Sequence, residues 1–305
     1  MGTDAAKGRA RLGPILSATV ACERAAVSAA AYCEWLGYSQ VDEGVLDEAE
    51  AIALGAPQAA GRAFAVVGCS RFGRLRFVDC VRPAGFRPLR HLGWAALELA
   101  VTDVDATARR LADSPFRILR PPAYLSSSAS LRAMQVAGPD DEVLYLTQRL
   151  APIEGFDLPE PTVPVDRLFI AVLACADLER SRAAYEAAFA VRRASDRHSA
   201  IRVLNDAFDL PEGTTHRLST LQLDGSCLIE FDQYPREATP RPSVPGELPW
   251  GIALVSLATT GLDRSTGALR DRLTPVASGP GGVRRVVGRG ASGELFELVE
   301  GIVDR

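Results

Sequence analysis

The sequence predicts an α+β fold built from four copies of one module, in which a strand leads through a polar step into a helix and further short strands follow. The clearest copy begins with the apolar run 168–173, whose length and β-branched residues are typical of a buried strand. Asp177 can then cap a helix, and the alanine-rich segment behind it favours one. Internal repetition of this unit is the main structural signal in the chain.

Three weaker copies lie elsewhere in the chain. The first has a strand ending at Cys22 and a helix expected from about Ala25 to Leu36, which Gly37 would end. The second and fourth copies begin with apolar strands at Trp94 and Trp250. Short strands are expected behind each helix, at 63–67, 74–78, 131–137, 142–147 and 201–204 among others. The turn between the strands 131–137 and 142–147 is expected at 138–141.

Proline-rich stretches separate the four modules. The segment 151–164 carries four prolines, which disfavour helix and central strand alike, so we interpret it as an interdomain linker. A single module cannot bury both its helix and the far face of its sheet, so modules should pair. The predicted division is a flexible arm at 1–13, a first domain at 14–150 with modules 14–83 and 91–150, the linker, and a second domain at 165–305 with modules 165–235 and 250–302.

Composition narrows the classes of function. The chain has 305 residues, of which 47% are hydrophobic and 24% charged, which is typical of a globular protein with a sizeable core. The net charge of -4 and the absence of a Lys/Arg cluster argue against nucleic acid or a membrane surface as partner. Six cysteines without a close pair indicate reduced thiols and a cytoplasmic location. A small-molecule substrate or ligand is the expected partner, and a homodimer is left open.

The order of these elements resembles the βαβββ module of the vicinal oxygen chelate superfamily, which includes glyoxalases, bleomycin-resistance proteins and extradiol dioxygenases. The motifs that carry the resemblance are Asp177-Leu-Glu-Arg-Ser with Tyr185, Asp103-Val-Asp-Ala, Gly138-Pro-Asp-Asp with Tyr145, and Gly290-Ala-Ser-Gly with Phe296-Glu-Leu. The resemblance implies two domains, each with two modules that curl into a half-barrel around a ligand cavity. It also implies metal ligands, usually His and Glu, on the first and last strands of the modules.

The positions where the resemblance implies metal ligands are largely unsuited to metal binding. Counting back from the polar step gives Ser17, Ala96 and Ile170 on first strands, with Arg167 as an alternative to Ile170 if that strand is longer. The last strands offer Tyr145, Glu230 and Glu297. None of the three histidines falls on a ligand position. We therefore expect no conventional His/Glu centre, and keep Glu230, Glu297 and His91 only as weak candidates to bind iron, manganese or magnesium.

Four residues are candidates for acid–base catalysis: Glu98, Tyr145, Glu230 and Glu297. Glu98 shares a strand face with Trp94 and Ala96, where burial would raise its pKa, but it could equally be a rim residue paired with an arginine. Tyr145 could donate a hydrogen bond to a substrate oxygen or belong to the core. The carboxylates Glu230 and Glu297 are the remaining acids at ligand positions.

Five residues are candidates for substrate binding: Ser17, Trp94, Arg132, Arg167 and Trp250. Arg132 could clamp a carboxylate, although an exposed strand arginine is the simpler interpretation. Trp250 could line a cavity or fill the core.

Three functions remain open at this point. The first is an enzyme that acts on an aromatic or oxygenated organic acid by acid–base chemistry, giving isomerase, lyase or ring-opening activity. The second is a non-catalytic protein that sequesters a hydrophobic drug or metabolite, which the low histidine count favours. The third is a metal-dependent extradiol-type dioxygenase that uses Glu297.

Overall fold

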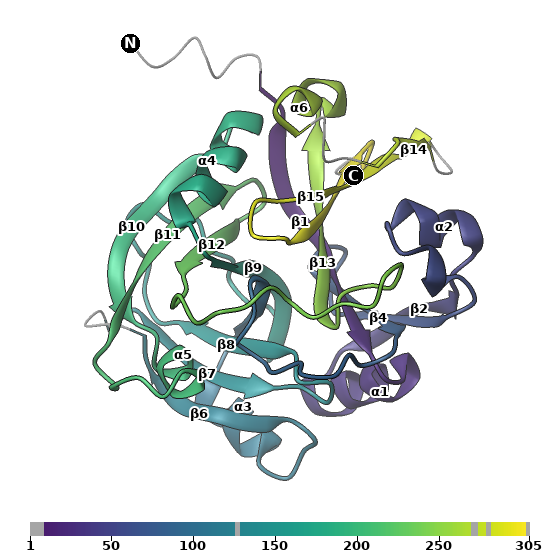
Figure 1. The fold of residues 1–305 in the computed structure, drawn as a ribbon. Helices are drawn as coiled ribbons and strands as arrows, with labels where there is room; N and C mark the ends of the chain where they lie inside the picture. Colours follow the sequence, from purple (N-terminus) through teal and green to yellow (C-terminus); the bar gives the residue numbers. More distant parts are fainter. Residues whose placement is uncertain (1–8, 126–128, 270–273, 279–281, 303–305) are drawn as a thin grey trace, which may run out of the picture.

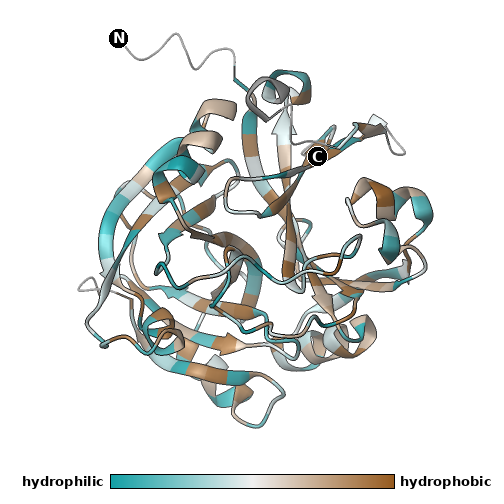
Figure 2. Cartoon of the chain, in the orientation of Figure 1, coloured by the Kyte–Doolittle hydropathy of each residue, from teal (hydrophilic) through white to brown (hydrophobic). Residues whose placement is uncertain are grey.

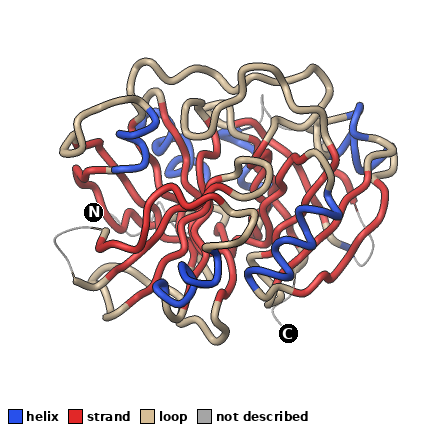
Figure 3. The backbone as a smooth tube through the Cα atoms, turned by 90° about the horizontal axis from the view of Figure 1, so that it is seen from below, coloured by secondary structure: helices blue, strands red, loops and turns tan. Residues whose placement is uncertain are grey.

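The structure is a computed structural model that describes residues 9–125, 129–269, 274–278 and 282–302, with the side chains of 266–269 left aside. Within these residues the chain forms two curled eight-stranded sheets with short helices around them (Figures 1 and 3). In strand order, the first sheet consists of β14 (Ala277–Ser278), β15 (Arg284–Arg289), β16 (Leu295–Glu300), β13 (Gly251–Thr260), β1 (Arg11–Cys22), β4 (Arg74–Asp79), β3 (Ala63–Gly68) and β2 (Ser39–Val45).

The second sheet repeats this arrangement. Its strand order is β10 (Arg192–Ala200), β11 (Thr215–Leu223), β12 (Cys227–Gln233), β9 (Val165–Cys175), β5 (Gly93–Val101), β8 (Val143–Arg149), β7 (Leu131–Ala137) and β6 (Arg117–Tyr124). The helices are α1 (Ala25–Leu36), α2 (Glu48–Ala53), α3 (Val104–Leu111), α4 (Leu178–Ala188), α5 (Arg202–Ala207) and α6 (Leu262–Leu269), with a 3₁₀ turn at Pro57–Ala59. The predicted α+β fold of four modules in two half-barrels is confirmed.

The pairing of the modules differs from the prediction. The central contact of the first sheet joins β1 to β13, and that of the second joins β5 to β9. Module one therefore shares a sheet with module four, and module two with module three, so the expectation that 14–150 and 165–305 each form a half-barrel is wrong. A local strand pattern shows that β1 and β5 have edges to pair but contains no information about which distant strand pairs with them. The module boundaries themselves stay predictions.

Consecutive modules contact each other through a helix and a hairpin. The Tyr32 hydroxyl on α1 donates to Glu142 Oε1 beside the hairpin of module two, over 2.7 Å. In the same way the Tyr185 hydroxyl on α4 donates to Glu294 Oε1 in module four, over 3.3 Å. Gly138 leaves room for the first carboxylate, because a Cβ there would lie 1.9 Å from Glu142 Oε1. Every module is thus bonded to one neighbour by its sheet and to another by this contact.

Most local predictions are confirmed. Asp177 accepts a hydrogen bond from the Arg180 backbone N–H at the start of α4, and α1 ends at Gly37 with a φ of 77°. Two predictions are wrong. The run 201–204 lies at the start of helix α5 instead of in a strand, because a short apolar run fits either element. The predicted arm is ordered from residue 9, with a buried Ala10 bridged to Phe189, while residues 1–8 lie outside the described residues.

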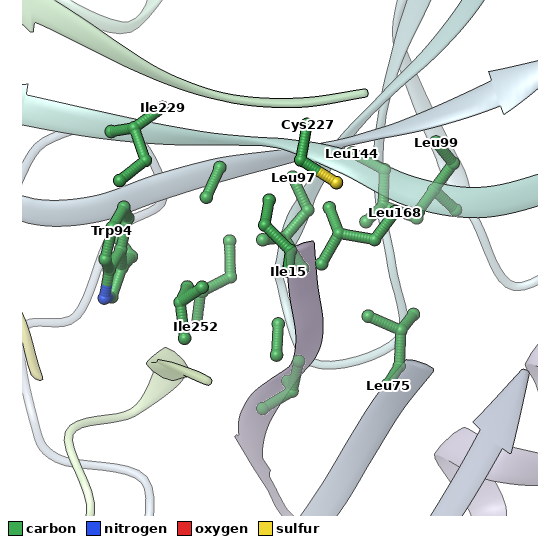
Figure 4. Close-up of a cluster of buried hydrophobic side chains, with 14 of the residues drawn as sticks. Ile15, Leu75, Trp94, Leu97, Leu99, Leu144, Leu168, Cys227, Ile229 and Ile252 are labelled. Atoms are coloured by element: carbon green, nitrogen blue, oxygen red, sulfur yellow. The ribbon is translucent and has the colours of Figure 1, made fainter. Parts of the chain in front are cut away.

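The main core lies between the two sheets. In Figure 4, Ile15, Leu75 and Ile252 of the first sheet point toward side chains of the second sheet, which include Leu97, Leu168 and Ile229. Hydrophobic segments gather on these central strands, whereas β10 at the outside is mostly hydrophilic (Figure 2). The opposite face of each sheet is left for other contacts.

Candidate functional site

A cavity of about 740 Å³ lies against the face of the first sheet that points away from the core. Strands β1, β4, β13, β15 and β16 and helix α2 supply its wall. Its polar lining side chains include Ser17, Glu50, Arg74, Arg76, Ser256, Arg285 and Glu297. Two residues predicted from the sequence, Ser17 and Glu297, are therefore brought together in one cavity by the pairing of modules one and four.

Glu297 is the carboxylate at the floor of this cavity. It is only 6% exposed, on β16 directly beside Ser256 of β13, which in turn lies beside Ser17 of β1. The Ser256 hydroxyl donates to Glu297 Oε2 over 2.6 Å. The other oxygen, Oε1, lies 3.8 Å from Nη1 of Arg285. This arrangement fixes one carboxylate oxygen and leaves the second toward the guanidinium side of the cavity.

Strand β4 forms an arginine wall, which we define as Arg74 and Arg76. These side chains alternate with Leu75 and Phe77, which are fully buried in the core. Arg76 donates from Nε to the Thr19 hydroxyl over 3.1 Å. The sequence analysis missed both arginines, although the alternation of Arg and apolar residues in a predicted strand was a signal that they share a face. Two guanidinium groups on one wall make the cavity suited to an organic anion.

The corresponding face of the second sheet also has carboxyl groups. Glu98 on β5 lies directly beside Tyr145 on β8 and accepts a hydrogen bond from the Thr147 hydroxyl over 2.9 Å. Burial, and then the charge of Glu230, raise the pKa of Glu98 to about 8. Glu230 on β12 lies 3.6 Å from Arg197, and burial raises its pKa. The structure thus gathers three of the four predicted catalytic residues on this face.

A further carboxyl group on this face, Asp232, was not predicted. It is 3% exposed, and its Oδ1 has no hydrogen-bond partner among the described residues. Burial, and then the charge of Glu230, raise its pKa well above the usual value. Val203 of α5 packs into the apolar cluster on this face, together with Phe156 and Leu158 of the predicted linker. The second half-barrel is therefore covered.

Both predicted tryptophans are buried in apolar clusters, and neither lines the cavity of the first sheet. Trp94 in module two donates from Nε1 to the Leu295 carbonyl of module four over 2.6 Å. Trp250 in module four donates from Nε1 to the Asp140 carbonyl of module two over 3.2 Å. Each side chain is about 1% exposed. The two indoles connect the half-barrels, and their role as substrate-binding residues stays a prediction.

The predicted binding arginines are also engaged elsewhere. Arg132 forms an ion pair with Asp105, with Nη2 to Oδ1 over 3.0 Å, and its guanidinium lies 5.5 Å from the ring centre of Tyr124. Arg167 donates from Nη2 to the Gly225 carbonyl over 2.8 Å. Neither side chain lines the cavity of the first sheet. The sequence placed them on strands correctly but could not show which neighbours they would contact.

The residues present do not fit the metal centre that the resemblance implies. Both ring nitrogens of His91 have protein partners: Nε2 accepts from the Arg87 backbone N–H over 3.1 Å, and Nδ1 lies 3.0 Å from the Thr239 hydroxyl. Both nitrogens that could coordinate a metal are thus engaged by protein partners in this structure. At the cavity floor Glu297 has two serines and a guanidinium around it, which is a poor donor set for a divalent cation. Among the described residues, no group of three or more His, Cys, Asp or Glu side chains is placed to hold a metal ion.

Comparison with known proteins identifies the fold of this chain. Neither a family model nor a curated protein matches the sequence. Among solved structures, glyoxalase I from Zea mays matches with a TM-score of 0.64 and 17% identity over 95% of this chain and 92% of that one. A putative dioxygenase from Bacillus subtilis matches with a TM-score of 0.63 and 12% identity over 96% of this chain and 86% of that one. Within the described residues, every helix is too short or too polar to cross a lipid bilayer. The chain has the tandem fold of these two proteins, the vicinal oxygen chelate fold that its four modules resemble.

Proposed function

We propose that the cavity of the first sheet binds a small oxygenated organic acid and that Glu297 performs acid–base chemistry on it. The observation that supports this proposal is a buried carboxylate in the same cavity as the arginine wall. Arg74, which has no ion-pair partner among the described residues, supplies the positive charge that an organic anion requires. Glu297 supplies a proton acceptor that Ser256 holds in one orientation.

The chemistry would be transfer of a proton at the carbon next to the substrate's carbonyl or carboxyl group. Glu297 Oε1 would take the proton from this carbon, and the electron pair left behind would move onto the adjacent oxygen. The guanidinium group of Arg74 would stabilise the developing negative charge. Return of the proton to a different carbon gives an isomerisation, and departure of a group from the neighbouring carbon gives a lyase reaction.

The arginine wall also supports the alternative function. A cavity with paired guanidinium groups binds an anion whether or not a base is used, so a sequestering protein for an acidic metabolite would have the same wall. The two functions differ in what happens to the bound acid. Only the enzyme removes a proton from carbon.

The test is exchange of carbon-bound hydrogen for deuterium in D₂O, followed by NMR. A panel of 2-oxo, 2-hydroxy and aromatic carboxylic acids is incubated with the wild type, with Glu297→Gln and with Glu160→Gln, a control at a carboxylate that is 85% exposed. We expect exchange in at least one acid, its loss by about 100-fold or more in Glu297→Gln, and no change in the control. Binding of an acid by the wild type without exchange would favour sequestration, and full exchange by Glu297→Gln would remove Glu297 as the base.

A further inference from the structure

Helix α2 places a carboxylate of the protein inside the anion site. Glu50 lines the cavity, and its Oε1 lies 3.2 Å from Nη1 of Arg76. The Arg76 side chain is only 13% exposed, so few other anions can reach it while Glu50 is there. One of the two guanidinium groups of the arginine wall is therefore already paired.

The second guanidinium group is not paired in this way. Arg74 donates from Nε to the Ser70 carbonyl over 3.0 Å, and it forms no ion pair with the residues that the structure describes. Alternate residues on one face of a strand are roughly 6–7 Å apart. Arg74 is thus free to receive a carboxylate, while its neighbour along the strand is occupied.

The geometry of α2 keeps Glu50 in place. The Asp47 side chain caps the helix by accepting from the Glu50 backbone N–H over 2.7 Å. Ala51 in the helix and Leu54 at its end are buried in an apolar cluster that contains Trp250. Glu50 is therefore presented to Arg76 by an anchored helix instead of a loose loop.

We infer that Glu50 makes this cavity select monocarboxylates over dicarboxylates. This inference rests on the proposed function, because it specifies the substrate class of the same cavity. A single carboxylate binds to Arg74 without disturbing the Glu50–Arg76 pair. The second carboxylate of a diacid would lie beside Glu50, where like charges repel, or would have to displace it from Arg76.

The test uses succinate and butyrate, which have the same number of carbons and differ by one carboxylate. Both are titrated by ligand-observed NMR against the wild type, Glu50→Gln and Glu48→Gln. Glu48 is an exposed residue in the first turn of the same helix and serves as the matched control. We expect Glu50→Gln to tighten succinate binding roughly tenfold, to change butyrate binding less than about twofold, and the control to leave both unchanged.

A second variant shows whether the effect acts through Arg76. In the background of Glu50→Gln, Arg76→Gln should abolish the gain for succinate. An equal gain for both acids in Glu50→Gln, or no gain for succinate while butyrate still binds, would overturn the inference and leave the proposed function standing. If neither acid binds to the wild type or to either single variant, the organic-acid site itself is wrong, and the inference is overturned with it.

Discussion

The two half-barrels have equivalent strand orders, but one sheet face lines an open cavity and the equivalent face is covered. The face of the first sheet opens onto a cavity of about 740 Å³ with the arginine wall and Glu297. The equivalent face of the second sheet has Glu98, Glu230 and Asp232 beneath helix α5 and the linker. The fold alone therefore does not determine whether a sheet face binds a ligand.

The difference arises in equivalent connections. Helix α2 joins β2 to β3 in module one, and helix α5 joins β10 to β11 in module three. In α5 the apolar Val203 and Leu204 are buried over the second sheet, whereas α2 buries only Ala51, in a separate apolar cluster, and places Glu50 at the cavity. A six-residue helix in this connection can therefore either cover the sheet face or contribute a side chain to a cavity on it.

The largest expected effect comes from removing the cover of the second half-barrel. Leu204 is 1% exposed, so Leu204→Ala should lower the free energy of unfolding by about 2–4 kcal/mol. Val66 lines the open cavity, and Val66→Ala should cost less than about 1 kcal/mol because solvent already reaches it. Urea denaturation of both variants measures the difference. Equal losses would mean that the two faces are equally packed.

The pH dependence of stability should also distinguish the two half-barrels. The folded-state pKa of Glu98 is raised to about 8, so the folded protein holds a proton that the unfolded chain releases near pH 4.5. Stability due to this group must then fall as the pH rises from about 4.5 to 8. Glu98→Gln should raise the melting temperature at pH 8 and change it little at pH 4.5. An effect that is independent of pH would contradict a raised pKa.

The smallest expected effect concerns the hydroxyls that hold the two carboxyl groups. Thr147→Val removes a donor to Glu98 in the covered half-barrel, where no solvent replaces it, and should cost about 1 kcal/mol. Ser256→Ala removes the donor to Glu297, where water in the cavity can take its place, and should cost less than about 0.5 kcal/mol. Chemical denaturation of the pair tests this order. The reverse order would indicate that the cavity excludes water.

The sequence was informative where the signal is local. The cap at Asp177, the end of α1 at Gly37 and the hairpin at 138–141 depend on residues close in the chain, and all three are present. Counting along repeated modules also led to Ser17 and Glu297, because strand register relative to a polar step is a local property.

The sequence was uninformative about contacts between strands that lie far apart in the chain. The partner of β1 could not be predicted, so neither could the meeting of Ser17, Ser256 and Glu297 in one cavity. The contacts of the two tryptophans were equally unpredictable, since their bonding partners lie in modules that the sequence assigned to the other domain. The ion pair between Glu50 and Arg76 could not be predicted either, because Glu50 precedes Arg76 by 26 positions and comes from a different element.

The crossed pairing of modules has a consequence for any attempt to divide the protein. A cut in the linker 151–164 would separate β1 from β13 and β5 from β9, so each fragment would hold two half-sheets with long apolar strands unpaired at their edges. Such edges template pairing with other chains. Each fragment should therefore aggregate when it is on its own, and the two should recover the fold only when they are refolded together. A protein cut in the linker could then report on the association of its two fragments.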